Sequence, residues 1–279
     1  MTGQDWRESG LALPRHGLGD WGRILWRGAA LVLVTLGGLA LLLALRLIER
    51  PLFGLARPWT PWLTQGVCRV SLRIMGLRLI RRGSPPMTGR GAVVANHASW
   101  LDIFVLNAVQ RIYFVAKAEV RQMALIGWLA AATGTVFIAR KSTDAKRQQK
   151  LFEDRLRAGH RLLFFPEGTS TDAIRIVPFK STLFAAFWTH GVEHVMAVQP
   201  VSVIYHAPKG ADPRLYGWWG TFDFLPHFLL VLAQKRQGRV ELVFHDPVPV
   251  DRFTDRKALA AHCEAEIRAA HPHGARREV

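Results

Sequence analysis

The chain is poor in cysteine and in acidic side chains. Its 279 residues include two cysteines, Cys68 and Cys263, which lie far apart in the sequence. This count excludes a disulfide-stabilised scaffold and a cysteine metal cluster. Asp and Glu together number 21 against 37 Lys and Arg, so the formal net charge is +16. An excess of this size indicates an anionic partner: a nucleic acid, a membrane surface or a phosphorylated substrate.

The signatures of several protein classes are missing. There is no Gly-x-Ser-x-Gly nucleophile elbow and no His-Glu-x-x-His zinc motif. Recognition-helix, zinc-finger and RNP patterns are absent as well, so we expect no nucleic-acid partner. Hydrophobic residues make up 49% of the chain, which excludes wholesale disorder and allows a sizeable core.

An uncharged stretch at residues 28–45 is rich in Leu, Val and Ala. As a helix it would be about 27 Å long, close to the ~30 Å hydrocarbon layer of a bilayer. No small-residue cleavage pattern follows it, so residues 1–57 are predicted to form an N-terminal segment with an uncleaved membrane anchor at about 28–48. A buried core helix and a shallow re-entrant hairpin are the alternatives. The arginines that follow the stretch favour a position of the rest of the chain on the cytoplasmic side of the membrane.

Residues 58–82 are predicted to form an amphipathic basic helix on the membrane surface. Residues 50–101 contain eight arginines and no Asp or Glu, and Trp59 and Trp62 lie near the start of this region. Apolar side chains alternate with arginines at helical spacing, a pattern typical of helices on anionic lipid. A solvated basic helix face is the alternative.

Residues 83–250 alternate between short apolar runs and helical patterns, which predicts an α/β domain with a mostly parallel central sheet flanked by helices. Residues 251–279 are expected to form a C-terminal helix and tail. The apolar residues 125–129 suit either the core or the lining of an apolar groove. The predicted strands are 92–95, 112–115, 135–139, 161–165, 196–204 and 239–244, and the predicted helices are 100–109, 120–132, 144–158, 181–188 and 256–270.

Polar clusters follow several of these strands. His97 comes directly after the strand at 92–95, Arg140 ends the strand at 135–139, and Glu167 follows the strand at 161–165. The carboxyl ends of parallel strands meet at one edge of a sheet, so these side chains are expected to converge. Asp102 is five residues after His97, close enough to hold one ring nitrogen and leave the other as a base. A capping Asp beside a turn His is the structural alternative.

Four ordered blocks carry a specific resemblance. They are Asn96-His97-Ala98-Ser99-Trp100-Leu101-Asp102, Gly134 to Arg140, Phe165-Pro166-Glu167-Gly168-Thr169-Ser170 and Val198-Gln199-Pro200. In order and spacing they resemble the blocks of the glycerolipid acyltransferase family, whose members transfer an acyl chain to a lysolipid hydroxyl. The resemblance covers roughly residues 69–250 and the N-terminal helices.

The resemblance implies a base-catalysed acyl transfer with acyl-CoA or acyl carrier protein as the donor and membrane lipids as partners. His97 would take the proton of the acceptor hydroxyl and Asp102 would orient His97. An acceptor site is implied for the remaining matched residues, with no metal and no cofactor. Those residues are Lys117, Arg140, Glu167, Gly168 and Thr169.

One position departs from the family pattern. Family members that act on lysophosphatidate usually carry an Arg after Glu-Gly-Thr, whereas this chain has Ser170. A bidentate phosphate donor is therefore lost, unless Arg175 or Lys180 replaces it. The departure slightly favours a lyso-ornithine lipid over 1-acylglycerol-3-phosphate, and members that acylate such aminolipids share the segment at 216–219. A silent lipid-binding protein and a lipid or thioester hydrolase are the rival functions.

Overall fold

A central sheet organises the computed structural model, which describes residues 6–7, 10–123, 126–138, 145–188 and 196–274. The sheet order is β1-β7-β6-β2-β5-β3-β4, with β8 paired to β6. All described neighbours run parallel except β6–β7 and β6–β8, which confirms the predicted mostly parallel α/β class. The strands are β1 (Arg78–Gly83), β2 (Gly91–Ala95), β3 (Tyr113–Lys117), β4 (Val136–Ile138), β5 (Arg161–Phe164), β6 (Ala197–His206), β7 (Arg239–Phe244) and β8 (Val248–Pro249).

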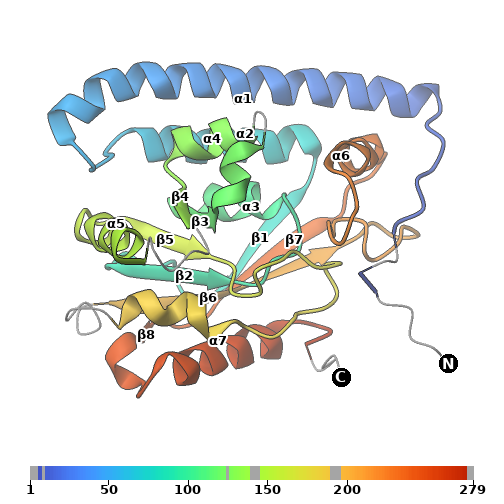
Figure 1. The fold of residues 1–279 in the computed structure, drawn as a ribbon. Helices are drawn as coiled ribbons and strands as arrows, with labels where there is room; N and C mark the ends of the chain where they lie inside the picture. Colours follow the sequence, from blue (N-terminus) through green and yellow to red (C-terminus); the bar gives the residue numbers. More distant parts are fainter. Residues whose placement is uncertain (1–5, 8–9, 124–125, 139–144, 189–195, 275–279) are drawn as a thin grey trace.

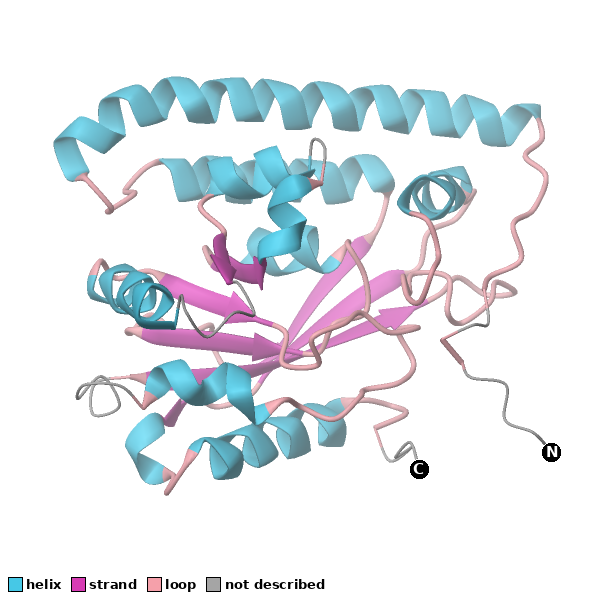
Figure 2. Ribbon diagram, in the orientation of Figure 1, coloured by secondary structure: helices cyan, strands magenta, loops and turns pink. Residues whose placement is uncertain are grey.

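Helices cover both faces of the sheet (Figures 1 and 2). Alternate residues of β2 serve the two faces: Val93 and Ala95 join the core under the first helical layer, and Ala92 and Val94 join the core under the second. The first layer holds α1 (Leu18–Phe53), α2 (Thr60–Met75), α3 (Asp102–Val109), α4 (Ile126–Thr133) and α6 (Phe224–Ala233); the second holds α5 (Ala145–Arg157), α7 (Arg256–Ala270) and a 3-10 segment at Ser181–Phe187.

The basic segment at 58–82 is a helix followed by a strand, so the prediction of one helix was too long. α2 ends at Met75 because Gly76 adopts a left-handed conformation with φ of 78°, and its N–H bonds the Arg73 carbonyl. β1 then pairs in parallel with β7. The helix is also less exposed than predicted, because Leu72 is buried in the core and α1 covers α2 (Figure 1).

α1 and α2 form a tight antiparallel hairpin. A Cβ at Gly38 would lie 2.5 Å from a methyl of Val67, so the two helices approach closely only because Gly38 lacks a side chain. At the turn, the buried Glu49 accepts the N–H groups of Trp59 and Thr60 at 2.8 and 3.1 Å. Glu49 therefore caps the amino end of α2 from the neighbouring helix.

α1 is long and apolar enough to cross a membrane, the one helix of the described chain that meets this test. It nevertheless lies lengthwise on the domain (Figure 1). Near its start, Arg23 and Arg27 donate to carbonyls at the end of α6, at 2.8 and 2.7 Å. Before it, Leu11 is buried in the core and the Trp6 carbonyl accepts from Trp219 at 3.0 Å. Both ends of α1 are thus attached to the same face of one domain.

Candidate active site

His97 and Asp102 meet at the carboxyl end of β2. The Nδ1 atom of His97 lies 2.7 Å from Oδ2 of Asp102. The carboxylate side chain is fully buried, whereas the His97 side chain is 21% exposed. The His97 ring stacks on Phe165 with centroids 4.0 Å apart and an interplanar angle of 12°. Because a carboxylate only accepts, Nδ1 carries the proton and Nε2 is left with a free lone pair.

Asp102 is held by three further donors. Its Oδ2 accepts the N–H groups of Ala98 and Ser99 at 2.8 and 3.0 Å, and its Oδ1 accepts the Tyr205 hydroxyl at 2.8 Å. Burial and the nearby Asp102 carboxylate hold the pKa of Tyr205 well above its ordinary value, so the hydroxyl remains a donor. The carboxylate therefore has a fixed orientation and a complete set of partners in a buried setting.

Sequence reasoning missed Tyr205, which lies beyond the fourth motif on β6. It also assigned no role to Asn96, whose side chain bonds both backbone groups of Val203 at 2.7 and 2.9 Å. Asn96 thereby extends the β2–β6 pairing by one step and fixes the start of the His97 loop. Asn96 could have been noticed because its polar amide directly follows the apolar run at 92–95. No local sequence pattern marks Tyr205.

Glu167 joins the two loops of the site. Its Oε1 accepts the His97 N–H at 2.6 Å and its Oε2 accepts the Val177 N–H at 2.7 Å. Burial raises the pKa of Glu167 to about 8. The two N–H groups favour the charged form and lower the pKa, but burial has the larger effect. The Glu167 side chain is 1% exposed, and its two hydrogen bonds are to backbone N–H groups. In the same turn, Gly168 is half-buried and Thr169 is exposed.

The remaining predicted residues are placed as follows. Lys117 ends β3 at the carboxyl edge of the sheet and is exposed. Arg140 lies outside the described residues. Arg175 is paired with the buried Asp172, whereas the Nζ atom of Lys180 lies 2.8 Å from where a Cβ of Gly168 would be. Among the described residues, Lys180 is therefore a cation beside the Glu-Gly-Thr turn.

The aromatic segment at 216–219 packs against the His97 loop. The Trp218 N–H donates to the Ala98 carbonyl at 2.9 Å, and a Cβ at Gly217 would lie 2.4 Å from the backbone of Asp172. Only glycine permits this close approach. The segment therefore packs against both the loop that carries His97 and the loop that carries Asp172.

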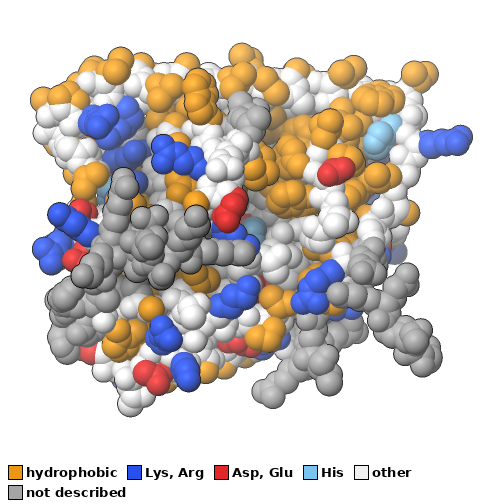
Figure 3. All heavy atoms as spheres, in the orientation of Figure 1, with side chains coloured by type: hydrophobic (Ala, Val, Ile, Leu, Met, Phe, Trp, Pro, Cys, Tyr) orange, Lys and Arg blue, Asp and Glu red, His pale blue; other side chains and the backbone are white. Residues whose placement is uncertain are grey.

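An apolar surface adjoins the site. Trp100, from the His97 loop, packs against Phe224 and Phe228 of α6 with ring centroids 5.5 and 5.6 Å apart. Its Nε1 donates to His227, whose pKa is lowered to about 4 by burial, so that ring is neutral and accepts the bond. Figure 3 shows hydrophobic side chains gathered over α6 and along α1. In α4, Trp128 is 72% exposed, which places this part of the 125–129 stretch outside the core.

The cysteine thiols and the Ser202 hydroxyl are nucleophilic groups that are buried away from substrate. Burial raises the pKa of both Cys68 and Cys263 to about 12, so their thiols stay protonated. Ser202, His245 and Glu266 form a chain with contacts of 2.9 and 3.3 Å that resembles a hydrolase triad. Ser202 is fully buried and also bonds the Ile267 carbonyl, so no substrate can reach it.

The fold and the dyad together define a class of enzyme. A histidine base with a buried carboxylate partner, set at the carboxyl edge of a parallel sheet beside an apolar surface, suits activation of a hydroxyl on a lipid-like substrate.

Comparison with known proteins gives the family. A protein-family model described as "Acyltransferase" matches residues 72–204. A lyso-ornithine lipid O-acyltransferase from Rhodobacter capsulatus is 59% identical over 248 residues, covering 89% of this chain and 90% of that protein. One from Brucella abortus is 35% identical over 254 residues, covering 85% and 92%. The chain therefore belongs to the acyltransferase family.

The fold is shared with a solved structure. The crystal structure of the 1-acyl-sn-glycerophosphate (LPA) acyltransferase PlsC from Thermotoga maritima matches with a TM-score of 0.64 at 22% identity. The match covers 93% of this chain and 98% of that chain, so it includes the N-terminal helices as well as the sheet.

Proposed function

We propose that this protein is a lyso-ornithine lipid O-acyltransferase that uses acyl-CoA or acyl carrier protein as the acyl donor. The observation that carries the proposal is the His97–Asp102 pair at the carboxyl end of β2, in which Nδ1 contacts the buried carboxylate and the ring is 21% exposed. The Rhodobacter capsulatus protein, similar along nearly its whole length, is a lyso-ornithine lipid O-acyltransferase by name, which supports this acceptor.

The chemistry follows from the tautomer. Nε2 of His97 takes the proton of the acceptor hydroxyl while the oxygen attacks the thioester carbonyl carbon. The C–O bond forms, the tetrahedral intermediate collapses, and the C–S bond breaks. The thiolate leaves and takes the proton back from Nε2. The Asp102 carboxylate stabilises the imidazolium in between, because the positive charge is 2.7 Å from Oδ2.

The acceptor head group is argued from Ser170. This half-buried residue supplies a hydroxyl where a guanidinium would clamp a phosphate, and the Arg175 guanidinium is paired with Asp172. A lyso-ornithine lipid presents a hydroxyl on an amide-linked chain and needs no phosphate clamp. In this proposal Lys180, whose Nζ lies beside Gly168, pairs with a carboxylate of such a head group.

Ser170→Arg is expected to shift acceptor preference toward lysophosphatidate. A charge-assisted bond to phosphate contributes about 1.5–3 kcal/mol, so the ratio of kcat/KM for lysophosphatidate over lyso-ornithine lipid should rise about 10–100-fold. Purified protein assayed with both acceptors measures it, and Ser170→Gln serves as the neutral control of similar size. An unchanged ratio in the Arg variant would show that position 170 does not contact the acceptor head group.

We further propose that α1 rests in one leaflet of the inner membrane, with the catalytic domain on the cytoplasmic side. Its outward side chains are apolar and exposed, among them Leu25, Leu33 and Leu47, while Ile24, Leu31 and Leu42 pack inward. The contacts that hold both ends of α1 to the domain support the re-entrant arrangement over a crossing helix.

Cysteine labelling tests this placement. The two native thiols are buried, so Gly10→Cys and Lys209→Cys, before and well after α1, each introduce one exposed thiol. Both are expected to resist a membrane-impermeant maleimide in spheroplasts and to react once the inner membrane is opened. Reaction of Gly10→Cys alone in intact spheroplasts would mean that α1 crosses the bilayer.

A further inference from the structure

A cavity of about 270 Å³ lies at the edge of the sheet opposite the His97–Asp102 pair. Tyr113 and Arg161, which line it, are the first residues of β3 and β5, whereas His97 and Glu167 follow the carboxyl ends of β2 and β5. The other wall is the turn between α1 and α2, including Phe53 and Pro61. The cavity is thus separate from the acyl-transfer site and next to the membrane-anchoring hairpin.

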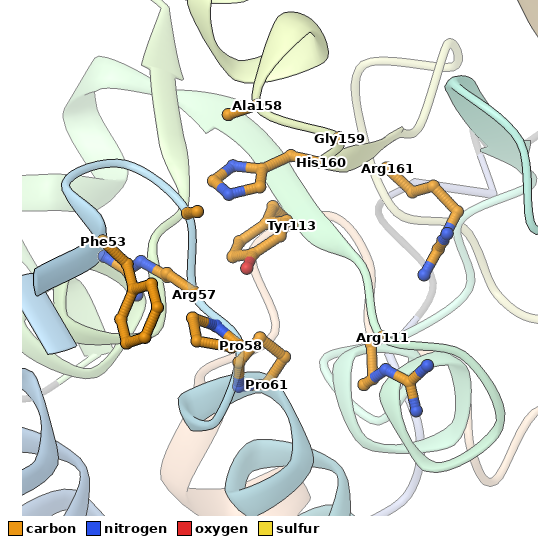
Figure 4. A pocket seen from close by; sticks show the side chains of 11 residues that line it. Phe53, Arg57, Pro58, Pro61, Arg111, Tyr113, Ala158, Gly159, His160 and Arg161 are labelled. Atoms are coloured by element: carbon orange, nitrogen blue, oxygen red, sulfur yellow. The ribbon is translucent and has the colours of Figure 1, made fainter.

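The cavity is strongly cationic. Three arginines line it, with Arg111 and Arg161 on one side of Tyr113 and Arg57 on the other (Figure 4). No Asp or Glu is among the described residues of its lining. The nearby Glu49 already accepts bonds from Arg46 and from the start of α2. Burial and neighbouring cations lower the pKa of Arg57 to about 10, which still leaves it charged at neutral pH.

Two donors around the cavity lack acceptors in the described chain. Nε of Arg155 and Nε of Arg161 are buried without a hydrogen-bond partner among the described residues. His160 is 4% exposed and stacks on Tyr113 at 4.2 Å, and its Nδ1 faces Arg155 at 3.1 Å. Burial and the neighbouring Arg155 and Arg57 lower the pKa of His160 to about 4, while a hydrogen bond with the backbone of Leu55 opposes the shift. Buried donors left without acceptors make this region electropositive, which favours an anion in the adjoining cavity.

The cluster is also rigid. Arg57 donates to the Ala132 carbonyl at 3.0 Å, and Arg155 donates to the Gly134 carbonyl at 2.8 Å. Both guanidinium groups lie near the ring of Tyr113, at 5.9 and 5.5 Å from its centroid. These contacts hold the like charges together in advance of any ligand, which lowers the cost of binding one.

The surroundings of the cavity indicate where the anion comes from. Exposed apolar side chains surround it on the α1–α2 turn: Phe53, Leu55, Trp59 and Trp62 are 42–58% exposed. The Arg111 guanidinium lies 3.6 Å from the centroid of the Trp62 ring. Aromatic rings beside cations are typical of protein surfaces at the level of lipid head groups.

We propose that this cavity binds the phosphate group of an anionic membrane phospholipid, at a site distinct from the acyl acceptor. The bound head group holds the α1–α2 turn at the surface of the bilayer, while Phe53, Trp59 and Trp62 enter the interface. The protein thereby prefers membranes with anionic lipid, independently of which acceptor it acylates.

Vesicle binding with a charge-matched control tests the proposal. The full chain, its Arg111→Gln/Arg161→Gln variant and an Arg252→Gln/Arg256→Gln control are each sedimented with phosphatidylcholine vesicles, with and without phosphatidylglycerol. Arg252 and Arg256 are exposed on the α7 side of the sheet, so the control removes the same charge from the opposite face. The cavity variant should lose at least tenfold in affinity for the anionic vesicles, and the control less than twofold. Neither should change on phosphatidylcholine alone.

Soluble ligands identify the source of the anion. Inorganic phosphate should weaken anionic-vesicle binding of the unmodified chain and raise its melting temperature, but not that of the cavity variant. An equal loss in both variants would overturn the proposal in favour of diffuse surface charge. Coenzyme A stabilising the unmodified chain but not the cavity variant, with unchanged vesicle binding, would overturn it in favour of an acyl-donor site. If the double variant melts early, Arg111→Gln alone, at the Trp62 side of the cavity, carries the same comparison.

Discussion

Replacing His97 by alanine is expected to lower kcat for acyl transfer by roughly 10²–10⁴-fold, the contribution of a positioned general base. The protein should still fold. Asp102 keeps its bonds from Ala98, Ser99 and Tyr205, so no buried charge is left unpaired. A radiolabelled acyl donor supplied with lyso-ornithine lipid measures the rate, and thermal unfolding and vesicle binding report the fold.

The same assay separates the rival functions. A hydrolase would release free fatty acid whether or not the acceptor is present, whereas a transferase consumes the donor at a useful rate only with the acceptor. A silent lipid-binding protein would show no His97-dependent turnover. A His97→Ala variant that is folded and as active as the unmodified chain would remove the catalytic role assigned to this ring.

Asp102→Asn is the second large effect expected, and it tests chiefly the negative charge of the carboxylate. His97 Nδ1 and the amides of Ala98 and Ser99 all meet Oδ2, so the Asn oxygen should take that position and keep the ring tautomer. The Asn amino group then donates to the Tyr205 oxygen. The negative charge beside the imidazolium is lost, and the buried Tyr205 hydroxyl loses its acceptor, so kcat should fall about 10–10³-fold and stability by about 1–3 kcal/mol.

Companion variants separate charge from packing. Asp102→Ala removes the acceptor as well, so two buried amides lose their partner and stability should fall by about 1–3 kcal/mol in addition to the loss of activity. Tyr205→Phe should lower kcat without raising KM, because its hydroxyl contacts Asp102 and no open surface. A fully active Asp102→Asn enzyme would mean that the carboxylate serves only to cap the loop.

Much of the fold follows from local sequence pattern. β7 and α7 have the predicted bounds, and the strands β2 to β6 lie within one or two residues of the predictions, because each is a short apolar run bounded by polar residues. β1 was missed because it carries three arginines and its pairing with β7 is far away in sequence. Glycine at position 76, rather than the hydrophobic period, determines where α2 ends.

The site was predictable only as far as its motifs reach. His97, Asp102 and Glu167 could be named from spacing, and parallel strands explain why they converge. The partners that fix them come from elsewhere: Tyr205 and Val203 from β6, and Val177 from a loop. Such partners depend on strand register, which a single sequence does not reveal.

β6 therefore positions both ends of the loop that carries His97. Val203 fixes the start of the His97 loop through Asn96, and Tyr205, two residues on along the same strand, fixes its end through Asp102. Both side chains belong to one core cluster on the same face of the sheet. A shift of β6 by a single residue would turn Val203 and Tyr205 away from the His97 loop together. The position of the His97 base therefore depends on the register of one buried strand.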